Sequence, residues 1–312
     1  MKAHGEPINL TAAAIAALIA VPVLIHPLLE RLARGKPQES RYARAAAVMR
    51  RQFPMILLLT ALLLFMIFES VLIDPWLTGA TGLDFTPAMH ELDGDASGWL
   101  QGLASGTVAD IYFYAMYMVF FVVVFYGTVM YFAAADEPSI VKKLVLGYCL
   151  MFAVALPFFL FFPVNEVWTT NADYATYNAA NGLPYYGFTD VRGVLYEMGS
   201  SNLDASFSFS SVDSCFPSLH TAISVFVPLV LISSKEKVWG AFSAFVGVSV
   251  VLATMYLGVH WLTDVAAGIA LAVAAWLAVS RLDVVVEYPF KVRSISLGRW
   301  KKTFGEGGDG PR

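Results

Sequence analysis

Two short stretches decide how this chain folds and what chemistry it offers: CFPSLHTA at residues 215–222 and GVHWLTD at residues 258–264. Pro217 is predicted to open a helix, because a proline ring already has helical geometry and has no N–H to leave unsatisfied. The amides that follow then point off the helix end. They belong to Ser218, Leu219 and His220. A helix start of this kind attracts anions, and phosphate in particular.

The second stretch places His260 and Asp264 four residues apart, hence on one face of a predicted helix. A carboxylate there holds an imidazole in one tautomer and stabilises its cation, as the acidic member of a catalytic triad does. An unpartnered carboxylate one turn into an apolar helix costs about 2.5–3.5 kcal/mol, so such residues usually mark function. Gly268 and Ala272 continue this face and predict close approach of another helix. For His220 and His260, a merely interfacial position is the alternative.

The composition is that of a membrane protein, with 58% hydrophobic and 14% charged residues against about 25% charged residues in soluble domains. Seven mostly apolar runs, measured against a length of roughly 18 or more residues, predict spanning helices, and the fifth is the shortest. They cover residues 8–29, 54–74, 111–134, 142–163, 218–234, 238–258 and 262–280. The expected fold is therefore an all-α, polytopic bundle of about seven spanning helices, without internal repeats or a second soluble domain.

The basic residues predict the orientation. When the loops are assigned alternately to two sides, all of the 20 Lys and Arg except Lys2 and Arg192 fall on one side. The positive-inside rule makes that side cytoplasmic. The N-terminus, the loops 75–110 and 164–217 and the two histidines are then extracytoplasmic and the C-terminus is cytoplasmic, as expected for a multi-pass protein of the plasma membrane.

Three segments are expected. Residues 1–53 form an N-terminal spanning helix and a basic cytoplasmic loop, residues 54–280 form a six-helix catalytic core, and residues 281–312 form a basic, partly disordered tail. The first apolar run ends in basic residues, the reverse of a cleavable signal, so we expect it to be retained. The long loop 164–217 is rich in aromatic residues, which predicts a folded cap.

The two cysteines, Cys149 and Cys215, give no disulfide framework, and neither is expected to be bridged. His90 and the acidic residues that follow it are interpreted as a solvated face of the loop and not as a metal site. No nucleic-acid partner, obligate protein partner or cofactor is inferred. The expected partners are membrane lipid and a lipid substrate.

The sequences FPSLHTA at 216–222 and YLGVHWLTDVAAG at 256–268 resemble the second and third signature motifs of the type 2 phosphatidic acid phosphatase superfamily. The resemblance extends over the last six predicted helices and implies an active site on the outer side. It implies that His260 is the nucleophile of a phosphohistidine mechanism, that Asp264 orients it, and that His220 is the acid and base. Ser218 and the helix-start amides, that of Leu219 among them, would hold the phosphoryl oxygens, and no metal would be required.

The chain departs from the family pattern at its cations. It has no Arg-Pro pair to end the first motif, and Ala253-Thr254 stands where the third motif usually has Ser-Arg. The loss of the third-motif arginine, together with the sequence FPSLH at 216–220, is similar to the inositol phosphorylceramide synthase and related phosphotransferase branch. Arg192 is the candidate for a replacement phosphate clamp. Anchoring to lipid phosphate is the alternative for this residue.

The expected function is transfer of a phosphoryl or phospho-headgroup group from a lipid donor at the outer leaflet, leaning to inositol-phosphotransferase-like activity. One alternative is a lipid phosphate phosphatase acting on phosphatidic acid or a polyprenyl phosphate. An inactive lipid-binding or transport protein on the same scaffold is a rival of another class. A metal hydrolase that uses His220, His260 and Asp264 is a third possibility.

Overall fold

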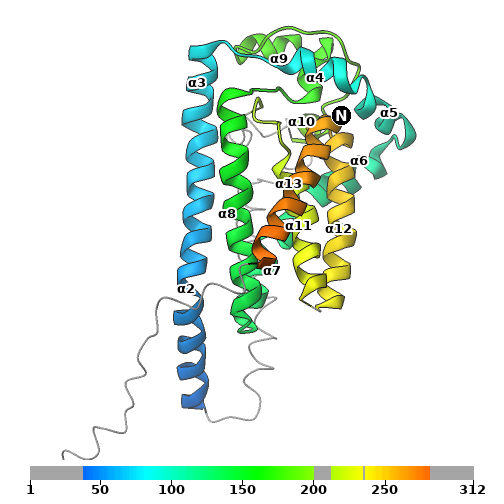
Figure 1. Cartoon of the computed structure of the whole chain (residues 1–312). Coiled ribbons are helices and arrows are strands. Elements are labelled where there is room, and N and C mark those ends of the chain that lie inside the picture. The colour runs from blue at the N-terminus through cyan, green and yellow to red at the C-terminus, as the bar shows by residue number, and fades with distance from the viewer. Residues whose placement is uncertain (1–37, 200–211, 235, 282–312) are drawn as a thin grey trace, which may run out of the picture.

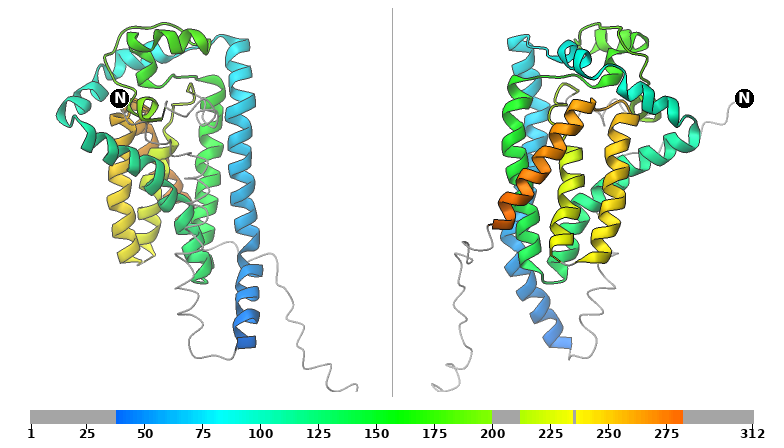
Figure 2. Two further views of the ribbon diagram at one scale, coloured as in Figure 1. Left: turned by 180° about the vertical axis from the view of Figure 1, so that it is seen from behind. Right: turned by 45° about the vertical axis from the view of Figure 1, so that its right-hand side comes forward.

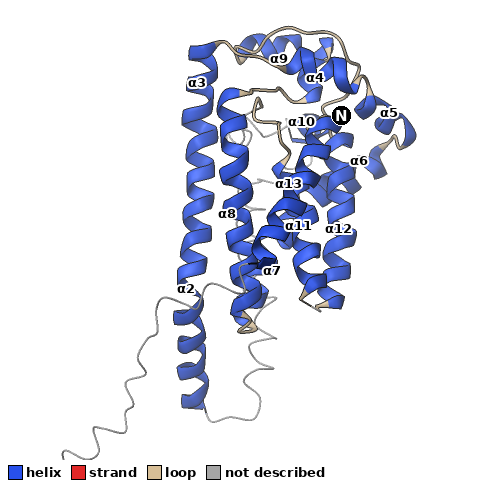
Figure 3. Cartoon of the chain, in the orientation of Figure 1, coloured by secondary structure: helices blue, strands red, loops and turns tan. Residues whose placement is uncertain are grey.

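The computed structural model describes residues 38–199, 212–234 and 236–281, and its regular elements there are all helices (Figure 3). The all-helical prediction is confirmed for this part of the chain. The predicted spanning helix 8–29 and residues 282–312 of the tail lie outside the described residues.

Five helices of the described chain are long and apolar enough to cross a membrane. They are Arg50–Thr81, Thr107–Ala134, Pro138–Phe161 (α8), Lys237–Tyr256 (α12) and Leu262–Arg281 (α13). A sixth apolar helix, α11 (Leu219–Ser233), has 15 residues. Seven spans are therefore not shown: the described chain has five helices of full length and one shorter helix.

The first two long helices contain π-helical turns. The first helix is built from α2 (Gln38–Phe68), a π-turn at Glu69–Ile73 and α3 (Asp74–Thr81). The second consists of α6 (Thr107–Ala115), π-turns at Met116–Phe120 and Val123–Gly127, and α7 (Thr128–Ala134). Such turns often occur at functional sites, because the extra residue redirects the side chains of one turn.

In the bundle, α8 lies between the α2–α3 rod and the group of α11, α12 and α13 (Figure 1). Two glycines let α11 approach its neighbours. A Cβ on Gly268 of α13 would lie 2.5 Å from the carbonyl oxygen of Ser218, and one on Gly247 of α12 would lie even closer to that of Ser224. Ala272 is also fully buried. The predicted close approach along the face of Asp264 is thus confirmed.

Short helices gather at one end of the bundle, as both views in Figure 2 show. We call residues 82–106, 164–199 and 212–217 the cap. Its helices are α4 (Thr86–Asp93), α5 (Ala96–Leu103), α9 (Ala175–Ala180) and α10 (Val194–Gly199), with 3-10 turns at Val167–Thr170 and Ala172–Tyr174. The cap is folded, as its aromatic content predicts.

The cap holds the turn that carries His260. Trp168 is fully buried between tyrosine rings, its nearest ring centroids being 4.9 Å away. Its backbone N–H donates to the carbonyl of Gly258 at 3.0 Å. The indole N–H of Trp261 donates to the carbonyl of Asn165 at 2.9 Å. The turn before α13 is therefore fixed from the cap side.

Candidate active site

The helix that follows the stretch 215–222, α11, begins at Leu219, two residues after the predicted start at Pro217. Ser218 is its N-cap, because the Ser218 Oγ accepts a hydrogen bond from the Thr221 N–H at 3.2 Å. The prediction that Pro217 opens the helix is wrong, because the serine side chain caps the first turn and Pro217 precedes it. The Ser218 N–H is also not free, since it donates to the backbone carbonyl of Asp264 at 3.1 Å. The first-turn amides of Leu219 and His220 have no acceptor within the helix.

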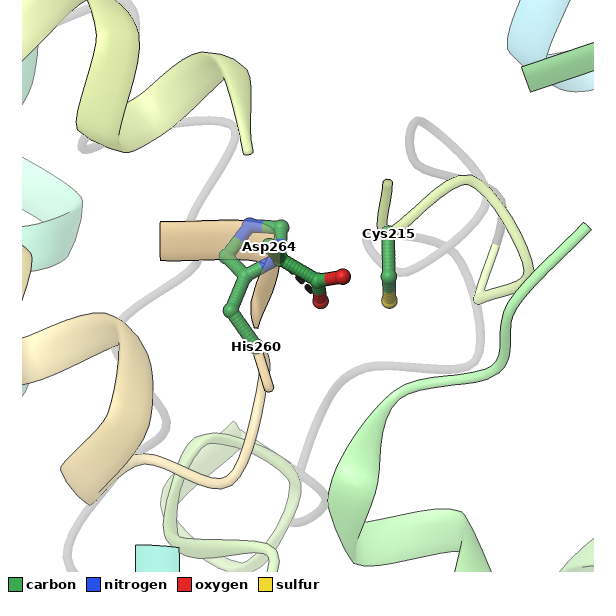
Figure 4. A group of neighbouring side chains, drawn as sticks. All are labelled: Cys215, His260 and Asp264. Atoms are coloured by element: carbon green, nitrogen blue, oxygen red, sulfur yellow. Dashed lines mark hydrogen bonds and ion pairs between the residues drawn. The ribbon is translucent and has the colours of Figure 1, made fainter. Parts of the chain in front are cut away.

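The stretch 258–264 also departs from the predicted geometry. His260 lies in the turn before α13, which begins at Leu262, so His260 and Asp264 do not share a helical face. Trp261 caps this helix: its carbonyl accepts from the Val265 N–H at 3.1 Å, and its N–H donates to Asp264 Oδ2 at 2.9 Å. The carboxylate of Asp264 therefore caps the start of α13 by accepting the backbone N–H of Trp261, as the N3 side chain does in a capping box. The pair still meets, with Nδ1 of His260 3.4 Å from Asp264 Oδ2 (Figure 4).

His260 is held at its backbone and at one ring nitrogen. Its N–H donates to the Thr254 carbonyl at 3.0 Å, and its own carbonyl accepts from Ser97 Oγ at 3.4 Å. With Asp264 beside Nδ1, the hydrogen-bond network assigns the ring proton to Nδ1. Nε2 is buried and has no hydrogen-bond partner among the described residues. A neutral imidazole held in this way carries its lone pair on Nε2.

His220 faces His260 across the start of the two helices, with ring centroids 5.9 Å apart. Its ring packs against Tyr117 at 4.6 Å and Phe121 at 4.7 Å, and the Tyr117 hydroxyl lies 3.5 Å from Nδ1. Tyr117 belongs to the π-turn Met116–Phe120. The sequence does not mark Tyr117 as a site residue, because an aromatic residue in an apolar run carries no motif signal.

Thr254 fills the position at which the family motif usually has arginine. It is fully buried, and its carbonyl accepts the N–H groups of both Val259 and His260 at 3.0 Å. This position therefore holds the backbone of the turn that carries His260, and it provides no cation.

Arg192 is engaged in ion pairs with residues of α6 and α10. Its guanidinium donates to Glu197 at 2.6 Å and to Asp110 at 3.4 Å, and the hydrogen bond to Glu197 raises the pKa of Arg192 above its usual value. Within the described ranges, no hydrogen bond or ion pair joins Arg192 to either histidine. Its role as a phosphate clamp stays a prediction.

Carboxylates outnumber cations around the site. Arg192 is the only Lys or Arg in the described cap. The buried acids at this end of the bundle are Glu69, Asp74, Glu166, Asp213 and Asp264. Burial, partly offset by a hydrogen bond from the Trp168 indole N–H, raises the pKa of Glu166 to about 8. One ligand atom each of Cys215, His260 and Asp264 lies within 4.8 Å of the other two.

The family model of the PAP2 superfamily matches residues 84–278, which is more than half of the chain. Searches of curated proteins and of solved structures gave no significant match. The matched residues contain both motifs and the last five apolar helices, whereas the helix Arg50–Thr81 precedes them. The expected extension over six helices is thus shown for five, and no branch of the superfamily is indicated. With its apolar helices and both motifs in place, this multi-pass membrane protein belongs to the PAP2 superfamily.

Proposed function

We propose that this protein is a membrane enzyme that transfers a phosphoryl or phospho-headgroup group from a lipid donor through a phosphohistidine on His260. One observation carries the proposal. Two histidine rings lie 5.9 Å apart, and Asp264 holds one of them so that its Nε2 is left without a partner among the described residues. Membership of a superfamily whose members are generally phosphatases or phosphotransferases supports it.

In the first step, the Nε2 lone pair of His260 attacks phosphorus while the bond from phosphorus to the leaving oxygen breaks. Protonated His220 gives its proton to that oxygen, and Asp264 stabilises the positive charge that develops on the imidazole of His260. In the second step, neutral His220 removes a proton from water or an alcohol, whose oxygen attacks phosphorus as the N–P bond breaks. Two in-line displacements thus replace one difficult transfer.

The start of α11 suits the phosphoryl oxygens. The amides of Leu219 and His220 are the proposed donors, at the positive end of the helix dipole. Ser218 fixes this helix start, because its hydroxyl oxygen accepts from the Thr221 N–H and its own N–H donates to the Asp264 carbonyl. Arg192 stays the proposed additional clamp, and its use requires release from Glu197 and Asp110.

We infer that the donor is a phosphodiester lipid, with a lean to inositol-phosphotransferase-like activity. A phosphomonoester carries almost two negative charges near pH 7, because its second pKa is about 6, whereas a diester carries one. Arg192 as the only cation of the described cap, together with the buried acids, favours the monoanion. A lipid phosphate phosphatase acting on phosphatidic acid or polyprenyl phosphate is the alternative, with water as the acceptor.

We place the cap and the site on the extracytoplasmic side of the plasma membrane. The described cations other than Arg192 support this orientation, because α2 and the turns opposite the cap carry most of them. They include Arg50, Arg51, Lys142, Lys143 and Lys237.

The decisive experiment traps the intermediate. Purified protein is mixed with phosphatidic acid or phosphatidylinositol labelled at phosphorus, with and without inositol, and the quenched protein is analysed for acid-labile phosphate on the peptide that contains residue 260. Wild-type protein should carry label and form product. His260→Ala should do neither, with an unchanged melting temperature in detergent.

His90→Phe is the matched control, because this cap histidine stacks on Phe188 at 4.3 Å and the substitution preserves that stacking. It should label like wild type. Labelling or full turnover in the His260→Ala protein would refute the proposed nucleophile.

A further inference from the structure

Three side chains of metal-binding types converge at one buried point. Cys215 comes directly before the motif at 216–222, and His260 and Asp264 belong to the motif at 256–268. Their exposed fractions are 2%, 5% and 0%. Figure 4 shows the carboxylate of Asp264 between the imidazole of His260 and the sulfur of Cys215, with one ligand atom from each residue within 4.8 Å of the others.

We propose that Cys215, His260 and Asp264 bind one zinc-type divalent ion, and that this ion inhibits the enzyme. Sulfur, imidazole nitrogen and carboxylate oxygen are the ligands that zinc takes in proteins. Bond lengths of roughly 2.0–2.3 Å in a tetrahedral site put ligand atoms about 3.3–3.8 Å apart. His260 Nδ1 and Asp264 Oδ2 already lie 3.4 Å apart. A side-chain movement on the order of 1 Å therefore completes the site.

A second observation points to a ligand here. Asp264 Oδ1 is buried and has no hydrogen-bond partner among the described residues. Leaving such an oxygen unpaired is costly, and more so for a charged group. A cation beside the carboxylate would satisfy it.

Charge balance favours the same occupant. With a neutral imidazole and a neutral thiol, the three side chains carry one negative charge. When the ion binds, the Cys215 thiol loses its proton to solvent and the metal–sulfur bond forms. The two negative ligands then cancel the two positive charges of the ion. A neutral site is the form that a low-dielectric interior tolerates best.

Inhibition follows from which atoms the ion takes, and this part rests on the proposed function. A metal on Nδ1 displaces the proton through which Asp264 orients His260, and that proton moves to Nε2, so the imidazole stays neutral. Nε2 then has no lone pair with which to attack phosphorus. Metal binding does not depend on the reaction, so metal binding and inhibition of turnover are measured separately.

The test uses purified, chelated full-length protein in detergent, titrated with Zn²⁺ for binding and turnover and with Co²⁺ for absorption. Wild type should bind one ion per chain, show a thiolate-to-cobalt charge-transfer band, and lose turnover as the ion binds. The chelated protein should keep full turnover. Cys149→Ala is the matched control, because the other cysteine lies in α8 away from the site, and it should behave like wild type.

Cys215→Ala should keep its basal turnover, lose the band and bind Zn²⁺ at least about 10–100-fold more weakly, the loss typical when even an outer-shell contact is removed. Cys215→Ser serves if the alanine variant does not fold, and it too should lack the band. No band in wild type, or equal Zn²⁺ affinity in the Cys215 variants, would overturn the site. If the cobalt-loaded protein shows the band but the chelated protein shows no turnover, the metal site stands and the proposed function is overturned.

Discussion

At the scale of single residues, one oxygen of Asp264 contacts both the start of α13 and the imidazole of His260. Oδ2 accepts the Trp261 N–H at 2.9 Å, and it lies 3.4 Å from Nδ1 of His260. The same carboxylate thus starts α13 and selects the imidazole tautomer. Asp93 of α4 supports this helix start, accepting hydrogen bonds from the backbone and the hydroxyl of Thr263.

Asp264→Asn should therefore lower kcat by about ten-thousand-fold, as the corresponding change does in catalytic triads. With the amide oxygen at the Oδ2 position, the side chain can still accept from Trp261 and lie beside Nδ1, but it carries no negative charge to stabilise the cation that develops on the imidazole of His260. Asp93→Asn is the matched control and should cost a little stability with most of the activity kept. The measurement is kcat together with the melting temperature. Near-normal activity of Asp264→Asn would make this residue merely structural.

The raised pKa of Glu166 predicts that the stability of the fold depends on pH. Its pKa is raised from 4.5 to about 8, chiefly by burial, with the charge of Asp213 adding to the effect. Between these values the folded state binds a proton that the unfolded state does not, so stability falls as pH rises from 4.5 to 8. Glu166→Gln keeps an acceptor for the Trp168 indole but carries no charge. It should match wild type at pH 5 and melt at a higher temperature at pH 8.

Glu91→Gln, which changes an exposed glutamate of α4, is the control and should leave the wild-type pH profile in place. Melting temperatures measured across this pH range decide the matter. A Glu166→Gln protein that loses stability with pH in parallel with wild type would show that another group is responsible.

At the scale of elements, the site depends on how closely α13 packs on α11. The bond from the Ser218 N–H to the Asp264 carbonyl, at 3.1 Å, joins the two helix starts. Gly268 makes that distance possible, because any Cβ there would meet the Ser218 carbonyl oxygen. Small residues are the usual means of such close approach between membrane helices.

Gly268→Ala should cost about 1–3 kcal/mol, the usual penalty of overpacking, and should lower kcat because α13 must move Asp264 away from Ser218. Gly247→Ala places a similar clash between α11 and α12, further from the histidines. It should lose stability with a smaller loss of kcat. Gly102→Ala in α5 meets nothing within 4 Å and should be neutral. A wild-type melting temperature and kcat for Gly268→Ala would contradict this account.

At the scale of the whole molecule, charge is segregated between the two ends. The described cap carries Arg192 as its only Lys or Arg, whereas Arg50, Lys142 and Lys237 lie towards the opposite end. Missing cations are expensive in a low-dielectric site, and more so for a dianion than for a monoanion.

We therefore expect a higher kcat/KM for a phosphodiester donor such as phosphatidylinositol than for phosphatidic acid, measured in competition. Arg192→Gln should lower both values if Arg192 clamps phosphate. Unchanged kinetics in that variant would assign Arg192 to its ion pairs with Asp110 and Glu197 alone. A clear preference for phosphatidic acid would refute the transferase lean and favour a lipid phosphatase.

What the sequence by itself determined is the membrane class, the approximate helix limits and the family. The run 262–280 and the helix Leu262–Arg281 nearly coincide, as do 238–258 and Lys237–Tyr256. The reason is that a membrane helix satisfies its backbone within its own segment, so its signal is local. The motif residues are likewise consecutive along the chain.

Only the tertiary structure decided where the helices of the site begin and what surrounds the histidines. Ser218 caps α11 while its N–H reaches Asp264, and Trp261, not His260, starts α13. Tyr117 reaches His220 from a π-turn 103 residues earlier. Cys215 meets Asp264 across two motifs. The contacts of Ser218 with Asp264, of Tyr117 with His220 and of Cys215 with Asp264 join segments far apart in the chain. No local pattern encodes the packing of the cap, or the close approach of the helices at Gly247 and Gly268, that brings these segments together.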